Sequence, residues 1–441
     1  MATIEFIGAF ESCYLPQHDI DIVETTGHDR RWRHDLALLR SCGVTRLRYP
    51  IRWHRVERAP GEYDWSATDE IFEHMGAEGF RPIVDLLHHC SYPRWLSGGF
   101  ADPRFRDAYL RYCEEVASRY PWLDSYTLLN EPFTTLFLCG HEGIWPPYGR
   151  GMSAFVALAR NVIPALADAA RMFADALPHA QHVYVDPCEG HSAGVEESSA
   201  TYAALANDRR FFVLDLLLGH HIDEDRPFFR SVMEHGGSDL LDIEPARVDV
   251  LGLDYYAHLE WSFDVNGATC PSARPQGLAA LILQYAERYA LPMILGETNI
   301  RGTATDRVSW LKYTLEQCEK ARMLGARLDG YCWFPFIDST DWDTLLANAD
   351  SHIDPVGVYW LDENLERRPS VMSAAYTAAA AGLPADALPA FRFRSPLDRW
   401  LKGLMPQMSH WDWREPDDNE LGMCDATIEI HDNWEVADVV A

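Results

Sequence analysis

The sequence contains no cysteine pattern typical of a zinc site, a redox motif or a disulfide framework. Its ten cysteines include no CxxC pair and show no regular spacing. Most of them lie in apolar runs, as reduced core thiols of intracellular proteins do. The first residues, Met1 to Gly8, carry an acid at Glu5 and do not resemble a signal peptide. We therefore expect a cytoplasmic protein.

Basic residues are also scarce. The chain has 38 Lys and Arg against 67 Asp and Glu, a formal net charge of −29, and the acids are dispersed rather than gathered in blocks. Binding to nucleic acid or to an anionic membrane needs a basic patch, and none is visible. No apolar run approaches the length of a membrane span. The sequence thus predicts neither a nucleic-acid nor a membrane partner, and it leaves the oligomeric state open.

What the chain does have is enough apolar sequence for a large core. Of its 441 residues, 47% are hydrophobic, and short apolar runs alternate with longer helical patterns, which is typical of βα units around a parallel sheet. Eight strands are predicted, at residues 4–8, 45–49, 81–87, 126–129, 182–185, 248–253, 293–295 and 330–334. Helices are predicted at residues 31–42, 67–78, 104–120, 155–177, 211–219, 278–289, 306–324 and 370–381. Eight such units close a (β/α)8 TIM barrel.

The pattern changes after residue 381. Residues 382–389 are rich in proline, alanine and glycine and suggest a linker, and residues 415–441 are acidic. We therefore predict one catalytic barrel over residues 1–381, with a C-terminal acidic extension over residues 382–441 whose role the sequence leaves open. Three alternatives stay open for this extension: packing on the barrel, an oligomer contact, or partial disorder.

Two predicted strands run directly into a carboxylate. The apolar run Tyr126 to Leu129 leads to Asn130 and Glu131, followed by Pro132, and Met293 to Gly296 leads to Glu297. In a (β/α)8 barrel the working residues stand at the C-terminal ends of the strands. Two acids at this rim indicate acid/base or nucleophilic chemistry. The alternative for Glu131 alone is a carboxylate at a helix N-terminus.

Other polar and aromatic residues are expected at the same rim. They are Glu11, Gln17, Arg48, His88, His89, Asn130, Asp254, Tyr255, Tyr256 and Trp333. Such a ring suits a polyhydroxylated ligand, whose hydroxyl groups need paired donors and acceptors and whose C–H faces stack on indole. Neighbouring residues on a strand point to opposite sides, so we expect only one of His88 and His89 to face the pocket. The sequence therefore predicts no metal site and no cofactor.

Several segments resemble family 1 β-glycosidases, within clan A of the retaining glycoside hydrolases. These segments are Arg48 to Val56, His89 with Pro93, Thr127 to Pro132, Gly140 to Gly149, Val250 to Tyr256, Trp333 to Trp342 and Gly357 to Ser370. They follow the order of the family's own motifs, and the similarity runs from about residue 4 to residue 381. The resemblance implies a β-glucosidase- or β-galactosidase-like enzyme that acts on a β-linked glycoside without a cofactor.

The resemblance also implies residue roles. Glu131 would be the general acid/base and Glu297 the nucleophile, with Arg48 and Tyr256 positioning Glu297. Substrate contacts would come from Glu11, Gln17, His89, Asn130, Trp333, Asp341 and Trp342. A retaining glycosidase needs its two carboxyl groups about 5–5.5 Å apart, one protonated and one ionised.

The chain also departs from the family pattern. Thr298-Asn299 follows Glu297 where the family has Asn-Gly, Asp254 stands where it has Asn, and Asp341 where it has Glu. The family's early sugar-binding Gln should fall near Leu15, and either Gln17 or Glu11 could replace it. Two alternatives therefore stay open. One is another clan A enzyme acting on an oligosaccharide or decorated glycoside, and the other is a sugar-binding barrel without catalysis.

Overall fold

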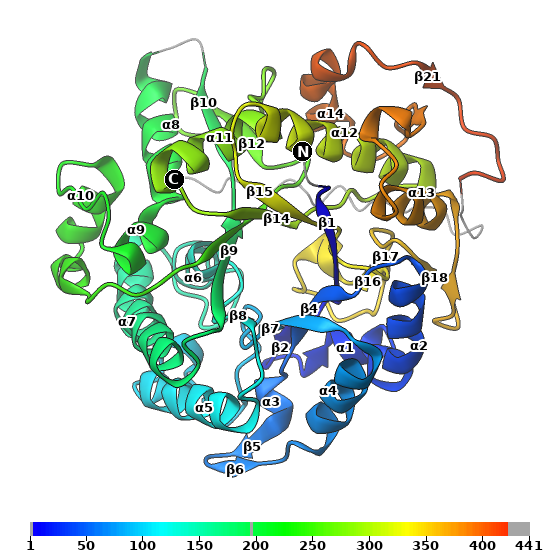
Figure 1. Ribbon diagram of the computed structural model, residues 1–441. Helices are drawn as coiled ribbons and strands as arrows, with labels where there is room; N and C mark the ends of the chain where they lie inside the picture. The colour runs from blue at the N-terminus through cyan, green and yellow to red at the C-terminus, as the bar shows by residue number, and fades with distance from the viewer. Residues whose placement is uncertain (1–2, 195–196, 422–441) are drawn as a thin grey trace.

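Eight parallel strands form a closed barrel at the centre of the molecule. The computed structural model describes residues 3–194 and 197–421. The strands are β1 (Glu5–Ala9), β4 (Arg46–Pro50), β7 (Arg81–Asp85), β8 (Ser125–Thr127), β9 (Gln181–Pro187), β11 (Val250–Asp254), β14 (Met293–Glu297) and β15 (Leu328–Cys332). Each pairs with its neighbours in chain order, and β1 pairs with both β4 and β15, which closes the sheet (Figure 1). The predicted (β/α)8 barrel is confirmed.

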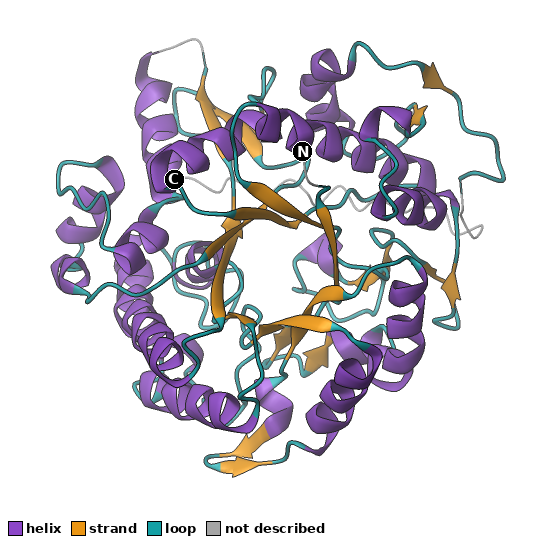
Figure 2. Cartoon of the chain, in the orientation of Figure 1, coloured by secondary structure: helices purple, strands orange, loops and turns teal. Residues whose placement is uncertain are grey.

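Helices surround the strands, as Figure 2 shows in purple around the orange barrel, and eight of them correspond to the predicted outer helices. They are α2 (His28–Ser41), α4 (Ser66–Glu78), α5 (Phe105–Arg119), α7 (Met152–Ala176), α9 (Phe212–Leu218), α11 (Leu278–Tyr289), α12 (Ala304–Met323) and α13 (Val371–Ala380). Each predicted helix overlaps one of them. α7 is long and apolar enough to cross a membrane by length and composition, but it packs against α5 as part of the outer ring.

The connections between the barrel strands carry further elements that the sequence pattern did not reveal. They include α6 (Pro132–Gly140), α8 (Glu197–Arg209), α10 (Pro227–Glu234) and a small sheet of β10 (Gly190–Ala193), β12 (Glu260–Phe263) and β13 (Thr269–Pro271). The strands of this sheet have at most four residues, and α6 follows its strand without a turn sequence. Their periodicity is therefore too short to read locally.

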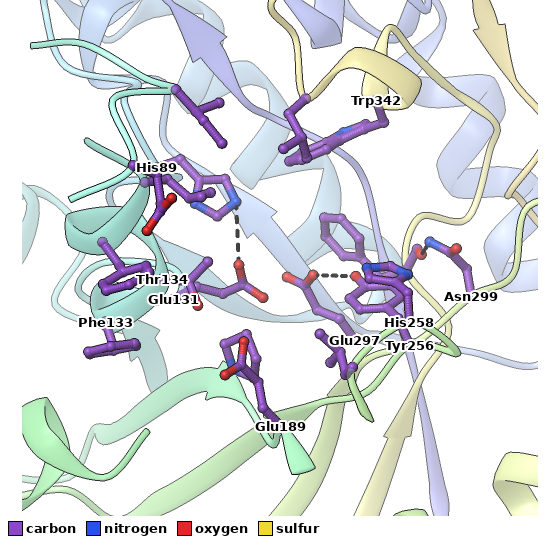
Figure 3. A pocket seen from close by; sticks show the side chains of 18 of the residues that line it. His89, Glu131, Phe133, Thr134, Glu189, Tyr256, His258, Glu297, Asn299 and Trp342 are labelled. Carbon is purple, nitrogen blue, oxygen red and sulfur yellow. Dashed lines mark hydrogen bonds and ion pairs between the residues drawn. The ribbon is translucent and has the colours of Figure 1, made fainter. Parts of the chain in front are cut away.

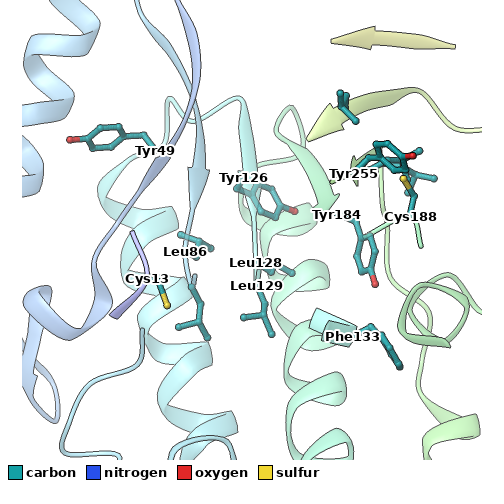
Figure 4. Close-up of a cluster of buried hydrophobic side chains, with 14 of the residues drawn as sticks. Cys13, Tyr49, Leu86, Tyr126, Leu128, Leu129, Phe133, Tyr184, Cys188 and Tyr255 are labelled. Atoms are coloured by element: carbon teal, nitrogen blue, oxygen red, sulfur yellow. The ribbon is translucent and has the colours of Figure 1, made fainter. Parts of the chain in front are cut away.

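Two hydrophobic layers hold the barrel together. The interior is filled by side chains from alternating strand positions, among them Ile7, Ile83, Val185 and Ile294. The larger layer lies between strands and helices, and part of it is drawn in Figure 4. There Leu128 and Leu129, the apolar residues that precede the Asn-Glu pair, are buried. Because this run is buried, the position of the Asn130-Glu131 pair at the end of the strand is fixed.

Residues 382–421 pack on the barrel. The segment 382–389, for which the sequence suggested a linker, lies against α12, where Lys312 Nζ donates to the carbonyl oxygens of Ala385 and Asp386 at 3.0 and 2.8 Å. β20 (Ala390–Phe391) follows, and Ser309 Oγ bonds both the N–H and the carbonyl of Phe391. α14 (Asp398–Leu404) and β21 (Trp413–Arg414) complete the described part. Residues 422–441, most of the acidic stretch, lie outside the described residues.

Candidate active site

The two strand-end glutamates face each other across the mouth of the barrel. One carboxylate oxygen of each of Glu131, Asp254 and Glu297 lies within 4.8 Å of the others. Figure 3 shows the side chains of Glu131 and Glu297 pointing toward each other. All three residues are at least nine-tenths buried. The separation of Glu131 and Glu297 therefore matches the short spacing that a covalent displacement at an anomeric carbon requires.

Glu131 sits at the turn between strand and helix. Its backbone adopts the left-handed conformation, with φ 46°, and it directly precedes Pro132, the first residue of α6. Its side chain makes no capping hydrogen bond to the helix, although its position is that of the helix cap. A non-glycine residue held in this conformation is a common feature of functional sites. The turn points the carboxyl group into the cavity instead of toward the helix N–H groups.

Glu297 is held by hydrogen bonds at both oxygens. Arg48 Nη1 donates to Oε1 at 2.6 Å, and Tyr256 Oη donates to Oε2 at 2.7 Å. Arg48 is buried and also donates to Asn130 Oδ1, which links the nucleophile candidate to the acid/base segment. The pairing of Arg48 and Tyr256 with Glu297 is the arrangement that the sequence predicted.

The protonation states of the neighbouring carboxyl groups differ from those in water. Burial raises the pKa of Glu131 well above its usual value, and the charges of Glu297 and Asp254 raise it further. Burial and the Glu297 charge likewise raise the pKa of Asp254, although Arg48 opposes them. The raised pKa keeps Glu131 protonated to higher pH than an ordinary glutamate, which is the state that a general acid needs.

Asp254 is the unexpected third member of this group. It ends β11 beside Glu297, and its carboxyl group interacts with those of both Glu131 and Glu297. Gly296 makes the close approach possible, since a Cβ there would come within 2.6 Å of Asp254 Oδ1. The sequence predicted Asp254 at the rim and marked it as a departure from the family's Asn, but it assigned Asp254 no role. Its contact with both glutamates becomes visible only in the barrel.

Both His88 and His89 line the cavity, so the expectation that only one would do so is wrong. β7 ends at Asp85, and His89 has φ 51°, so strand alternation no longer applies. Burial lowers the pKa of His88, but Glu11 and Asp85 outweigh burial and raise it to about 10. Burial and the positive charges of His88 and Arg48 lower the pKa of His89, which is therefore neutral.

His89 lies next to the acid/base candidate. Its Nε2 is 3.9 Å from Glu131 Oε2, and its Nδ1 bonds Thr135 Oγ1 at 2.8 Å. Glu11 and Trp342 also line the cavity, and the Trp342 indole N–H donates to Glu11 Oε2 at 2.7 Å. Asn130 is buried, and its Nδ2 has no partner among the described residues. These four predicted substrate contacts therefore lie at or beside the two glutamates.

Trp333 does not line the cavity, contrary to prediction. It is fully buried, and its indole N–H donates to the carbonyl of Val356 at 2.9 Å. The neighbouring Phe334 faces the cavity and packs on His88 and Arg48. Counting from Phe334 to Trp342 also reproduces the eight-residue spacing of the family's Trp-Ser-x-x-Asp-Asn-x-Glu-Trp motif without an extra residue. The correct register therefore places Phe334 where the motif begins with Trp.

Asp341 and Gln17 are likewise not among the residues that line the cavity. The Asp341 carboxylate accepts the backbone N–H groups of Ser351 and His352 at 3.0 and 2.8 Å, so it holds its own loop together. Gln17 is exposed in the turn between β2 (Tyr14–Leu15) and β3 (Ile20–Asp21). Of the two candidates for the early sugar contact, only Glu11 lines the cavity.

A closed parallel barrel with two carboxyl groups at this spacing on its C-terminal rim defines a glycoside hydrolase of the retaining type. A sequence model of glycosyl hydrolase family 1 matches residues 16–268. The chain belongs to glycosyl hydrolase family 1.

The individual relatives have low sequence identity to this chain but match most of its length. β-Glucosidase A of Thermotoga maritima is 20% identical over 380 residues, which cover 77% of this chain and 83% of the relative. The thermostable β-glucosidase B of Thermobispora bispora is 24% identical over 357 residues, which cover 71% of this chain and 73% of the relative. The structure of the Thermotoga maritima β-glucosidase with glucoimidazole superposes with a TM-score of 0.72 at 18% identity, covering 86% of this chain and 98% of that one.

Proposed function

We propose that this protein hydrolyses a β-linked glycoside by double displacement, with Glu131 as acid/base and Glu297 as nucleophile. The observation that carries the proposal is the spacing of the two carboxyl groups, whose oxygens lie within 4.8 Å across one cavity. The relatives named as β-glucosidases, and the family structure bound to glucoimidazole, support a sugar as the ligand.

In the first step, Glu131 gives its proton to the glycosidic oxygen while Glu297 attacks the anomeric carbon. The bond to the leaving oxygen breaks, and a covalent glycosyl-enzyme remains. The charge of Glu297 is thereby consumed, which removes one of the causes that raise the pKa of Glu131. Glu131 then takes a proton from the water that attacks the intermediate, and Glu297 leaves as a carboxylate.

The neighbouring residues have separate tasks in this mechanism. Arg48 and Tyr256 orient Glu297 and balance its charge in the free enzyme. The unpartnered Nδ2 of Asn130 is a buried donor that a sugar hydroxyl would satisfy. Neutral His89, Glu11 and Trp342 supply further polar and aromatic surface around the sugar ring.

The test is the stereochemistry of the first product. With an aryl β-glycoside as substrate, proton NMR during the first minutes should show the β-anomer of the released sugar before mutarotation, because two inversions restore the configuration. An α-anomer as first product would exclude the covalent mechanism. Absence of hydrolysis across aryl β-glucosides, galactosides and fucosides, with sugars still binding, would instead indicate a sugar-binding protein.

We also propose a reducing, cytoplasmic location for the protein. All nine cysteines in the described part of the chain are free, and eight of them are buried. Cys90 and Cys139 approach to 3.5 Å between their Sγ atoms without a disulfide. A thiol-specific reagent should titrate ten free thiols in protein that was unfolded without reductant. Fewer free thiols would contradict this proposal.

A further inference from the structure

The catalytic cavity continues outward into a compartment with mostly apolar walls. The cavity has a volume of about 290 Å³, and its inner end holds Glu131, Glu297 and the two histidines. The apolar residues that line the rest of the cavity include Phe133, Phe137, Leu138, Ile144, Leu259, Trp261, Phe263, Leu345, Val356 and Leu397. Glu131 protonates the glycosidic oxygen, which joins the sugar to its leaving group. The leaving group of a bound glycoside would therefore extend from that oxygen into this compartment.

The charged groups around this compartment are largely paired with one another. Glu189 is 2.9 Å from His191 and 3.6 Å from Arg209, and Arg301 is 2.6 Å from Asp354. A second sugar ring would need free donors and acceptors to replace the water that its hydroxyl groups lose. His191 Nδ1 and Arg209 Nε have no partner among the described residues, but most of the lining surface is hydrocarbon and indole.

One wall comes from the C-terminal extension, which lies beyond the region that resembles the family. Leu397 lines the cavity from the segment between β20 and α14, and it is only half-buried. Behind it, Trp400 of α14 packs edge-on against Trp261 of β12, with ring centroids 5.4 Å apart. Trp261 itself lines the cavity.

The extension is fixed in this position by contacts on both sides. Ser395 Oγ donates to the carbonyl of Arg301 at 2.7 Å, and the Arg394 N–H donates to Asp306 Oδ1 at 2.6 Å. A Cβ at Gly403 would come within 2.4 Å of the Ser272 carbonyl oxygen, so α14 lies directly on the chain that follows β13. Figure 1 shows the extension in orange and red beside α12.

We infer that the C-terminal extension is a specificity element of the enzyme and that the aglycone it selects is an apolar alkyl or aryl group, not a second sugar. The inference rests on the proposed glycosidase function. Leu397 contacts the aglycone directly, and Trp400 acts through Trp261 as a positioning residue.

The experiment compares methyl, butyl and octyl β-glycosides and a β-linked disaccharide, all with the glycone whose aryl β-glycoside is hydrolysed fastest. The alkyl alcohols are chemically similar leaving groups, so kcat/KM reports contact with the walls. We expect kcat/KM to rise about two- to fourfold per methylene until the compartment is filled. We also expect the octyl glycoside to exceed the disaccharide.

The variant Leu397→Ala should lower the octyl-to-methyl ratio of kcat/KM about five- to tenfold, mainly through KM. Leu383→Ala is the matched control, because Leu383 is an exposed leucine of the same extension, and both kcat/KM values should stay at the wild-type level. Equal thermal midpoints of the two variants would exclude misfolding as the cause.

Two results would overturn the inference. One is an octyl-to-methyl ratio in Leu397→Ala equal to that of the wild type, and the other is faster hydrolysis of the disaccharide than of the octyl glycoside. Failure of the proposed function is distinguishable from both, because no aryl β-glycoside would then be hydrolysed at all.

Discussion

At the scale of single residues, the unusual feature of this site is a third carboxyl group where the family has an amide. Asp254 is completely buried, and one of its carboxylate oxygens lies within 4.8 Å of an oxygen of Glu131 and of Glu297. An amide there could donate a hydrogen bond but would carry no charge. Asp254 instead raises the pKa of Glu131, after burial and Glu297.

The variant Asp254→Asn should therefore move the alkaline limb of the kcat/KM profile to lower pH. Glu131 must be protonated to act as acid, so activity is lost as the pH rises through its pKa, and a smaller upward shift places that loss at lower pH. The measurement is a pH profile with phenyl β-glycoside, whose poor leaving group needs the proton.

Asp329→Asn makes the same chemical change at an exposed position of barrel strand β15 and should leave the profile unchanged. If Asp254→Asn also keeps the wild-type alkaline limb, Asp254 does not tune Glu131.

Replacing the nucleophile candidate provides a second prediction at this scale. Glu297→Gly should reduce turnover of an aryl β-glycoside by at least about a thousandfold, because no covalent intermediate can form. Added azide or formate should restore much of the rate by entering the space that the side chain leaves. The product with azide should be the α-glycosyl azide.

Tyr256→Phe serves as the comparison for this experiment. It removes one hydrogen bond to Glu297 but keeps the nucleophile, so it should lose activity more moderately and gain nothing from azide. A Glu297→Gly variant that retains full activity would show that another group attacks the sugar.

At the scale of structural elements, the loop after β15 depends on one buried carboxylate. Asp338 accepts the N–H groups of Val356, Gly357 and Leu361 at 2.8–3.0 Å and forms an ion pair with buried Arg307 at 3.2 Å. These bonds join the loop that carries Trp342 to the closing segment of the barrel.

Asp338→Ala should lower the free energy of unfolding by about 3–5 kcal/mol, because it leaves the Arg307 charge buried without its partner. Chemical denaturation followed by tryptophan fluorescence measures this loss. Asp350→Ala, an exposed residue of the same loop, should change stability by less than about 0.5 kcal/mol. Similar losses for both variants would contradict the assigned role of Asp338.

The element scale also explains which site residues could be predicted. Glu131 and Glu297 each follow a buried strand, so local sequence was sufficient to place them. Trp333 and Phe334 are adjacent, and only the direction in which the chain leaves β15 decides that Phe334 faces the cavity. The sequence prediction was off by one position, so it named Trp333, a core residue, as a sugar contact.

At the scale of the whole molecule, the net charge of −29 opposes the compact state through repulsion between dispersed acids. Raising the concentration of sodium chloride from 10 to 300 mM should therefore raise the thermal midpoint by about a few degrees, because the salt screens exposed charges. Differential scanning fluorimetry at constant pH measures this shift.

An uncharged solute, glycerol at the same osmolality, is the control and should raise the midpoint less than the salt does. A midpoint that falls with added salt would mean that attractive surface ion pairs outweigh the general repulsion.

The sequence by itself determined the eight strands, their order and the positions of the two strand-end carboxyl groups, because an apolar run that ends in an acid is a local pattern. It did not determine which neighbours share the cavity. Asp254 joins the two glutamates, Leu397 forms part of a wall and Asp341 turns to its own loop only through packing between segments far apart in the chain. Such contacts depend on how closely backbones approach, as at Gly296 and Gly403, and only the tertiary structure decides that.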